Sequence, residues 1–485
     1  MKFNVLLSLI GAGSFALAGC GGGGSSPPTA SPSPAAASTA NIVTHGTISG
    51  FGSVIVNGVR YDTSSAQFSD EGSSITQSDL KVGQFVRLRG EVPASGAARA
   101  LQIEHDDLLE GPISAIDTAA GTLVVLGQTV IIDADTSFDD RIVPASLAGL
   151  AVAQWIEVDG LPGPGGVIHA TRIEPEAAGQ EMEVTGPVSE LDSITRTFRI
   201  GSLEVDYAQA RLEDFPASGI ADGDQVEVKG NALSASGELL AAEVELQRLT
   251  DLSDIDDFEI EGYITRFASA TDFDVGTQRV TTNGSTEFED GTASDLAAGI
   301  KIEVEGDIDS TGMLVAEEIS IRRPGDVRIT GAIESIDATA RHIQVLGVQI
   351  QLDERTRFED KTAAGDVFLS AARLATGDRV EVRGFEDPAQ ANRMIATRLE
   401  RDDDGDNEVE LRGNVQQVAA PALTIMGVRI DTTSATEFRD DDIAISATAF
   451  FDQAAARLVE AEGAWNGAAI IATEVELEDD ARLAP

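Results

Sequence analysis

The chain of 485 residues contains one short acidic stretch whose side chains could bind a metal ion. Asp402, Asp404, Asp406 and Glu408 alternate with other residues, so a carboxylate recurs at every second position. Carboxylate oxygens are the ligands that Ca²⁺ prefers in proteins. The stretch is not an EF-hand loop, because the expected glycine and the distal glutamate are missing. Two interpretations therefore remain open, a Ca²⁺ site and a solvated linker between domains.

A second set of acidic side chains recurs at the end of a motif of the type Thr-x-Phe-x-Asp. An aspartate at the end of a strand can accept hydrogen bonds from the backbone N–H groups of the turn that follows. Each of these carboxylates could instead bind a metal ion, and we favour the turn. The six aspartates are Asp70, Asp140, Asp214, Asp290, Asp360 and Asp440.

Residues for catalysis are much harder to find in this chain. His45, His105, His169 and His342 stand at unrelated positions and do not have the spacing of metal ligands. The sequence lacks a G-x-S-x-G elbow, a phosphate-binding P-loop and an H-E-x-x-H motif. A pair of carboxylates for glycoside hydrolysis cannot be chosen among 82 acidic residues, and aromatic residues for a sugar cleft make up only 5%. We therefore predict that the protein is not an enzyme.

The N-terminal segment carries the one feature that points to a covalent modification. A basic start is followed by a short apolar stretch and by Leu-Ala-Gly-Cys at residues 17–20, which include the only cysteine of the chain. This pattern resembles a bacterial lipobox. The resemblance implies cleavage before Cys20 and acylation of its thiol and of the new amino group. We expect a lipoprotein signal peptide over residues 1–19 and a membrane as partner, reached through the lipid.

Residues 21–40 consist only of Gly, Ser, Pro, Thr and Ala. Such a segment has no apolar surface to bury, so we predict that residues 20–40 form a lipidated cysteine followed by a disordered tether. Gly21, rather than an aspartate, follows the cysteine. By resemblance to lipoprotein sorting in Gram-negative bacteria, this favours the outer membrane.

The rest of the chain repeats one glycine-punctuated unit six times, with a period of roughly 65 to 80 residues. Each unit opens at a glycine with apolar neighbours, such as Gly46, and closes at a glycine after an alternating strand-like run, such as Gly90. We number the units repeats 1 to 6. Their predicted limits are 41–107, 108–178, 181–250, 257–324, 326–402 and 408–480.

Repeat 5 shows the pattern most clearly. Apolar and polar residues alternate on both sides of Gly347, which predicts a β-hairpin with a tight turn at the glycine. A short strand that ends near Phe358 and two further alternating runs follow. About six short strands with one apolar face each must close on themselves to bury that face. We predict an all-β fold of six tandem small barrels, OB-like or SH3-like, with about six short strands each.

The copies differ at one turn and in one segment of variable length. Ala153 and Ala456 replace a glycine that four repeats have before the fifth strand, so we expect different turns there. The Ala-rich segments 363–373 and 443–456 are expected to carry a helical turn or a short helix. The four glycines are Gly83, Gly223, Gly299 and Gly377.

Composition excludes several functional classes. The formal net charge is −48, with 82 acidic and 34 basic residues. Proteins that bind a phosphate backbone need a basic surface, so nucleic acid is excluded as a partner. No cofactor is expected, apart from the Ca²⁺ that the acidic stretch could hold.

The motifs in their fixed order resemble the DUF5666 repeat family. They are G-x-I-x-x-I, the glycine hairpin, T-x-F-x-D, L-x-x-G-D-x-V-E-V-x-G and A-x-x-I-E, and they recur from Gly46 to about Asp480. The resemblance implies a bacterial envelope lipoprotein or secreted protein of unknown function, and it transfers no catalytic residue.

Three hypotheses about function follow from these patterns. The leading one is a non-enzymatic, lipid-anchored envelope protein that acts as a binding or spacer module for an unknown envelope protein or polysaccharide. The second is a Ca²⁺-dependent adhesion or matrix protein. The third is a hydrolase of envelope polysaccharide.

Overall fold

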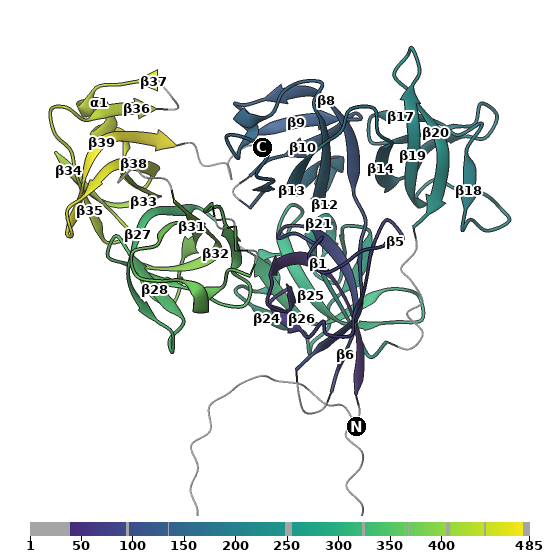
Figure 1. The fold of residues 1–485 in the computed structure, drawn as a ribbon, viewed down its shortest axis with the longest axis horizontal. Helices are drawn as coiled ribbons and strands as arrows, with labels where there is room; N and C mark the ends of the chain where they lie inside the picture. The colour runs from purple at the N-terminus through teal and green to yellow at the C-terminus, as the bar shows by residue number, and fades with distance from the viewer. Residues whose placement is uncertain are drawn as a thin grey trace, which may run out of the picture. The chain divides into compact units, whose positions relative to one another are not determined.

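A computed structural model describes residues 39–93, 97–133, 135–247, 255–322, 325–363, 365–366, 368–403, 408–440 and 443–478. These residues form β-strands almost throughout, with a single α-helix, α1 (Ala447–Gln453). The predicted all-β class is therefore confirmed. Figure 1 shows the strands and the helix in chain order.

The strands form three sheets, and each sheet combines two repeats. Repeats 1 and 4 supply β1 (Ala40–Gly50), β2 (Val54–Val56), β3 (Val59–Tyr61), β4 (Gln67–Asp70), β5 (Ser73–Ser74), β6 (Phe85–Val92), β7 (Arg99–His105), β21 (Asp257–Ser269), β22 (Asp272–Val275), β23 (Gln278–Thr281), β24 (Glu287–Glu289), β25 (Lys301–Ile308) and β26 (Leu314–Arg322). Repeats 2 and 3 supply β8 (Leu109–Asp117), β9 (Thr122–Val125), β10 (Gln128–Ile131), β11 (Ser137–Phe138), β12 (Trp155–Pro162), β13 (Ile168–Glu176), β14 (Met182–Pro187), β15 (Ser189–Asp192), β16 (Thr197–Ile200), β17 (Leu203–Asp206), β18 (Arg211–Glu213), β19 (Gln225–Leu233) and β20 (Leu239–Leu246). Repeats 5 and 6 supply β27 (Val327–Asp337), β28 (His342–Val345), β29 (Val348–Gln351), β30 (Arg357–Asp360), β31 (Arg379–Glu386), β32 (Arg393–Asp402), β33 (Val409–Ala419), β34 (Ala422–Ile425), β35 (Val428–Asp431), β36 (Glu437–Asp440), β37 (Ile443–Ala444), β38 (Leu458–Trp465) and β39 (Ala469–Glu478).

Repeat 5 shows how one repeat closes into a barrel. β27 pairs with β28, β28 with β29, β29 with β32, β32 with β31, and β31 again with β27. The predicted hairpin at Gly347 joins β28 to β29. The pairing of β31 with β32 is interrupted by a bulge at Gly384. A Cβ at this position would lie 2.0 Å from the carbonyl oxygen of Ile395, so the strands can approach this closely only at a glycine. The ring of strands buries the apolar face without leaving a free edge in the barrel.

The first strand of each repeat has a second role, because it also joins two barrels. β1 pairs with β21 in parallel (Figure 1). Their register places Thr44 opposite Glu259. β8 pairs with β14, and β27 with β33, both antiparallel. Repeats 1 and 4, 2 and 3, and 5 and 6 are thereby coupled through continuous hydrogen bonding.

The cores follow the same pairing. A single cluster of buried side chains extends through repeats 5 and 6, from Val327 to Leu477, and another through repeats 2 and 3, from Leu109 to Val244. Val43 of repeat 1 belongs to the cluster of repeat 4. Buried apolar area stabilises a fold by roughly 25 cal/mol per Å², so shared cores bind the paired barrels together.

Two expectations about the variable regions have different outcomes. The short helix expected in 443–456 is present as α1, and a turn of 3₁₀ helix, Ala371–Arg373, stands in the other Ala-rich segment. The expectation that Ala153 and Ala456 change their turns is wrong. They have φ values of 69° and 59°, in the same left-handed region that the glycines of the other repeats adopt. Contacts around the turn therefore impose its shape even without glycine.

Candidate functional site

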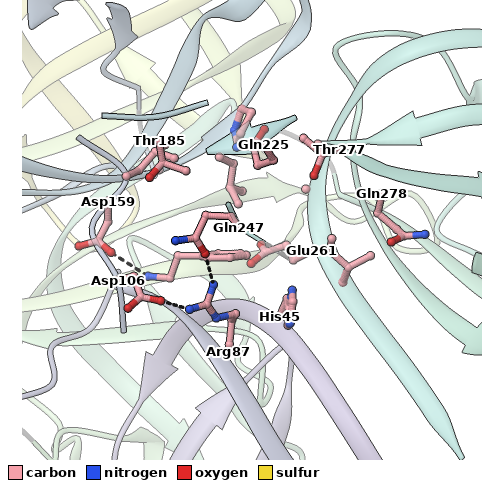
Figure 2. A pocket seen from close by; sticks show the side chains of 18 of the residues that line it. His45, Arg87, Asp106, Asp159, Thr185, Gln225, Gln247, Glu261, Thr277 and Gln278 are labelled. Carbon is pink, nitrogen blue, oxygen red and sulfur yellow. Dashed lines mark hydrogen bonds and ion pairs between the residues drawn. The ribbon is translucent and has the colours of Figure 1, made fainter. Parts of the chain in front are cut away.

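Strands of repeats 1 to 4 converge around a cavity of about 270 Å³. Figure 2 shows His45 and Arg87 of repeat 1, Asp159 of repeat 2, Gln247 of repeat 3 and Glu261 of repeat 4 around this hollow. The cavity is therefore a product of the assembled repeats, since each repeat contributes only part of its wall.

Charged groups in the wall are held by one another. Arg87 donates to Asp106 and, over 3.4 Å, to the side-chain oxygen of Gln247 (Figure 2). Glu261 accepts from the backbone N–H of Thr47 at 3.0 Å and forms an ion pair of 2.7 Å with Lys301. These contacts link repeats 1, 3 and 4 and give the cavity a fixed polar rim.

His45 stands in this wall as a neutral side chain. Burial, helped by the charge of Arg87, lowers the pKa of His45 to about 3. Its ring packs edge-on against Phe258 at 5.2 Å between centroids. An imidazole in this setting acts as a packing group, because it stays uncharged at neutral pH.

A different histidine, His105, lies behind the wall at the junction of repeats 1 and 2. β4 and β7 run in parallel, and their register places Asp70 directly beside His105. Asp70 Oδ1 lies 2.9 Å from Nδ1 of the imidazole. On the other side of the ring, Asp159 Oδ1 on β12 lies 2.8 Å from Nε2, and Asp107 Oδ1 lies 3.6 Å from the same nitrogen. His105 is only 2% exposed, so this junction is enclosed.

Asp159 also fixes the neighbouring backbone, because the same Oδ1 accepts from the N–H of Phe85 at 3.0 Å. Its second oxygen, Oδ2, is buried and has no hydrogen-bond partner, and Asp107 Oδ1 is in the same state. Glu157 stands two residues before Asp159, and its carboxylate lies within 4.8 Å of the other two ligand atoms of His105 and Asp159. The junction thus gathers more negative charge than its one imidazole can balance.

Titration in this cluster follows from burial and charge. Burial alone would lower the pKa of His105, but the charges and hydrogen bonds of Asp159 and Asp70 hold it well above its usual value. Burial and the charge of Glu157 raise the pKa of Asp107, and burial and the charge of Asp159 raise the pKa of Glu157 to about 8. Each shift retains a proton that reduces the excess negative charge.

The four histidines share no repeat position, so the sequence pattern does not single out His105. A usable signal was nevertheless present. His105 directly follows the A-x-x-I-E motif, and at this place repeats 2, 3, 4 and 6 have Pro175, Leu246, Ile321 and Leu477. This position is mostly apolar in the other repeats. A histidine there, which can bind a metal ion or a proton, indicates that the position has a different role in repeat 1. Asp159, which comes from the next repeat, could not be paired with it without the fold.

The metal ligands predicted in the acidic stretch are only partly described. Asp404 and Asp406, like Cys20, lie outside the described residues. Asp402 Oδ1 lies 3.4 Å from Nε of Arg379, and the same guanidinium donates to the backbone oxygen of Glu408 at 2.8 Å. Arg379 thus supplies a protein cation next to both Asp402 and Glu408, and the Ca²⁺ site stays a prediction.

The strand-end aspartates mostly bind side chains. Asp360 accepts backbone N–H bonds, as expected, including one of 2.7 Å from Asp366, and it also pairs with Arg401. Asp70 pairs with His105, Asp140 with Lys361 and Asp440 with Arg457. The expected turn is therefore only part of their role, because the parallel last strand brings a nitrogen base within reach in repeats 1 and 5.

Two other acidic clusters among the described residues already contain a protein cation. Arg211 pairs with Glu213 and Glu243, and Arg328 pairs with Glu410 and Glu460. A guanidinium at such a position occupies the place that a metal ion would need. The His105 cluster differs from both because its basic group is an imidazole.

Among the described residues, no helix has the length and apolar character required to cross a membrane. A search of curated proteins found no match. A family model described as a domain of unknown function, DUF5666, matches six segments, residues 43–104, 110–174, 185–245, 261–320, 330–400 and 412–476. These matches cover most of the chain, and the chain therefore belongs to the DUF5666 family as a protein of six repeats.

Proposed function

We propose that the protein is a non-enzymatic, lipid-anchored component of a bacterial cell envelope whose six barrels act as one binding block. The Leu-Ala-Gly-Cys sequence at 17–20 supports the anchor, and Gly21 supports the outer membrane. The bound molecule is an envelope protein or polysaccharide, since the net charge of −48 disfavours nucleic acid.

One observation carries the choice of binding over spacing. A linear spacer needs contacts only between successive repeats, whereas repeat 1 here pairs with repeat 4 and four repeats enclose one cavity. Ligand sites are typically concave and lie where domains meet. Charged side chains of the cavity wall are already paired, Arg87 with Gln247 and Glu261 with Lys301, which favours binding over chemistry.

Cell fractionation tests the anchor. The wild type should sediment with outer membranes, and Cys20→Ser should release the chain from them. The neighbouring substitution Ser25→Ala is the matched control and should leave sedimentation unchanged. Recovery of the wild type as a soluble periplasmic protein would contradict the anchoring.

A pull-down from envelope extract tests the cavity. Thr277 is exposed and lines the cavity, so Thr277→Trp should obstruct it without burying a new side chain. Ser236→Trp, at an exposed turn outside the lining, is the control. The proposal predicts that molecules retained by the wild type and by Ser236→Trp are lost with Thr277→Trp. Equal retention by all three would rule out the cavity as the binding site.

A further inference from the structure

We propose that His105, Asp159 and Glu157 form a binding site for one first-row divalent metal ion, such as Zn²⁺ or Mn²⁺, at the junction of repeats 1 and 2. The ligands are Nε2 of the imidazole and one oxygen of each carboxylate. The three ligand atoms lie within 4.8 Å of one another. This site is separate from the acidic stretch near residue 402 and independent of the lipid anchor.

The spacing of the ligand atoms suits such an ion. Bonds of about 2.0 to 2.2 Å from Zn²⁺ to nitrogen and oxygen place tetrahedral ligand atoms about 3.4 Å apart. Nε2 of His105 and Oδ1 of Asp159 lie 2.8 Å apart, bridged by a hydrogen bond. A metal ion replaces that proton if the two groups separate by about 0.6 Å.

The second nitrogen of the ring is already held in the manner of a metal-binding histidine. Metal-bound imidazoles commonly give their other N–H to a carboxylate, which fixes the tautomer and the ring orientation. Asp70 occupies this place at 2.9 Å from Nδ1. Once a metal ion displaces the proton from Nε2, the proton kept on Nδ1 by Asp70 leaves the lone pair of Nε2 free to bind that ion.

Unpaired buried oxygens are the independent sign of a missing ligand. Asp159 has a side chain that is 1% exposed, yet its Oδ2 has no hydrogen-bond partner. An unsatisfied buried acceptor costs about 1 to 3 kcal/mol, and more when it is charged. Arg172 lies opposite Asp159 on β13 but directs its N–H groups to Glu174, Asp139 and the backbone oxygen of Val82. Oδ2 of Asp159 therefore receives no N–H from Arg172 and is left without a donor.

The donor set selects the class of metal. Imidazole nitrogen favours Zn²⁺ and related transition ions, whereas Ca²⁺ and Mg²⁺ prefer sites made only of oxygen. Three protein ligands leave a fourth position, and Asp159 also lines the cavity. A molecule that enters the cavity could approach this position, and Asp107 Oδ1, 3.6 Å from Nε2, would accept a hydrogen bond from water there.

Isothermal titration tests the site in the full chain carrying Cys20→Ser, after treatment with a chelator. At pH 7.5 we expect one Zn²⁺ per chain, weaker Mn²⁺ binding and still weaker Ca²⁺ binding, with release of protons as Zn²⁺ binds. Asp159→Asn and His105→Asn should each weaken Zn²⁺ binding more than the ~10–100-fold expected for loss of an outer partner. His342→Asn, at a half-buried histidine of repeat 5, is the control and should bind as the wild type does.

Two results would overturn the proposal. One is the absence of Zn²⁺ binding by the wild type, which would mean that protons alone balance the cluster. The other is Zn²⁺ binding that survives both substitutions, which would place the ion elsewhere. Should His105→Asn fail to fold, Glu157→Gln serves instead. Glu157 is half-buried, and glutamine keeps the size and polarity of the side chain. Visible absorption of the Co²⁺-loaded protein then reports whether a mixed nitrogen and oxygen site persists.

Discussion

Repeats 1 and 5 pair the strand-end aspartate with different basic side chains, a histidine in repeat 1 and an arginine in repeat 5. In both, the strand-end aspartate lies opposite the last strand in parallel register, Asp70 beside His105 and Asp360 beside Arg401. Arg401 contacts both oxygens of Asp360, at 2.7 and 3.2 Å. Burial opposes ionisation of Asp360, but these bonds and two backbone N–H groups lower its pKa to about 2. The pair in repeat 5 is a permanent ion pair.

The imidazole of repeat 1 leaves one nitrogen for a partner outside the repeat. His105 binds Asp70 through Nδ1 and reaches Asp159 of repeat 2 through Nε2. The junction of repeats 1 and 4 has a similar excess of carboxyl groups. Glu259 accepts a hydrogen bond from Thr44 of repeat 1 and lies near Glu303. By contrast, buried Glu359 of repeat 5 faces Arg398 and Lys361 where it meets repeat 2. The comparison suggests that repeat 5 carries its own cations, whereas repeat 1 takes protons or a metal ion from solution.

The largest effect should come from removing the permanent cation of repeat 5. Arg401→Met leaves the carboxylate of Asp360 buried without its partner, and breaking such a pair costs about 3 to 5 kcal/mol. Hydrogen exchange in β30 and β32 should accelerate accordingly. Arg429→Met is the control, since Arg429 is 60% exposed in its pair with Asp431 and should change stability by less than about 1 kcal/mol. Equal losses of stability in the two variants would mean that the Arg401–Asp360 pair contributes no more than an exposed pair.

The orienting role of Asp70 gives the next largest effect. Asp70→Asn keeps the shape of the side chain but removes the charge beside Nδ1, so Zn²⁺ affinity should fall about 10–100-fold. Isothermal titration measures this change. Asp140→Asn, at the same place in repeat 2 and 76% exposed, should leave Zn²⁺ affinity unaltered. Unchanged binding by Asp70→Asn would mean that repeat 1 does not use its strand-end aspartate to prepare the imidazole.

The acid-rich junction of repeats 1 and 4 should respond to pH in the opposite sense to repeat 5. Burial and the neighbouring Glu305 raise the pKa of Asp257 to about 9, and burial and Glu303 raise the pKa of Glu259. Raised values in the folded state mean stability that is present below about pH 4 and lost as pH rises toward 9. For Asp360, with a lowered pKa, stability is present above about pH 4 and lost as pH falls toward 2.

A single substitution measures the first half of this contrast. Glu305→Gln removes one charge next to Asp257 and Glu259 and should stabilise the junction at pH 8 by on the order of 1 kcal/mol, with less gain at pH 5. Hydrogen exchange in β1 and β21, corrected for intrinsic rates, reports the change. Glu287→Gln, on exposed β24, is the control. A gain that does not depend on pH would show that charge is not the cause.

The smallest effect concerns the backbone that the repeats share. Repeat 5 has Gly377 at φ 95°, whereas repeat 2 has Ala153 at φ 69°. The left-handed conformation costs an alanine about 1 to 2 kcal/mol more than a glycine. The greater conformational entropy of glycine in the unfolded chain offsets part of this difference. Ala153→Gly should therefore stabilise repeat 2 by up to about 1 kcal/mol in thermal unfolding. Destabilisation would mean that the turns differ and that the repeats cannot be compared position by position.

Alternation and turn glycines were enough to predict the barrels from the sequence. The hairpin at Gly347 and the helix at Ala447–Gln453 both follow from local preferences. The pairing of repeat 1 with repeat 4 does not, because 215 residues separate Thr44 from Glu259 and both strands would suit other edges. The His105 cluster was missed for the same reason: β4 must pair with β7 to place Asp70 beside the ring, and β12 of the next repeat must place Asp159 on its other side. At Ala153 the tertiary contacts override the preference of the residue.

The most direct test of the central claim is hydrogen exchange of the full Cys20→Ser chain with and without Zn²⁺. The account predicts that Zn²⁺ slows exchange in β7 and β12, which carry His105, Glu157 and Asp159, and leaves β30 and β32 of repeat 5 unchanged. The same experiment on Asp159→Asn should show no slowing in β7 and β12. Equal exchange at the repeat 1 junction with and without Zn²⁺, or equal slowing at both places, would contradict the claim that repeat 1 draws its cation from solution.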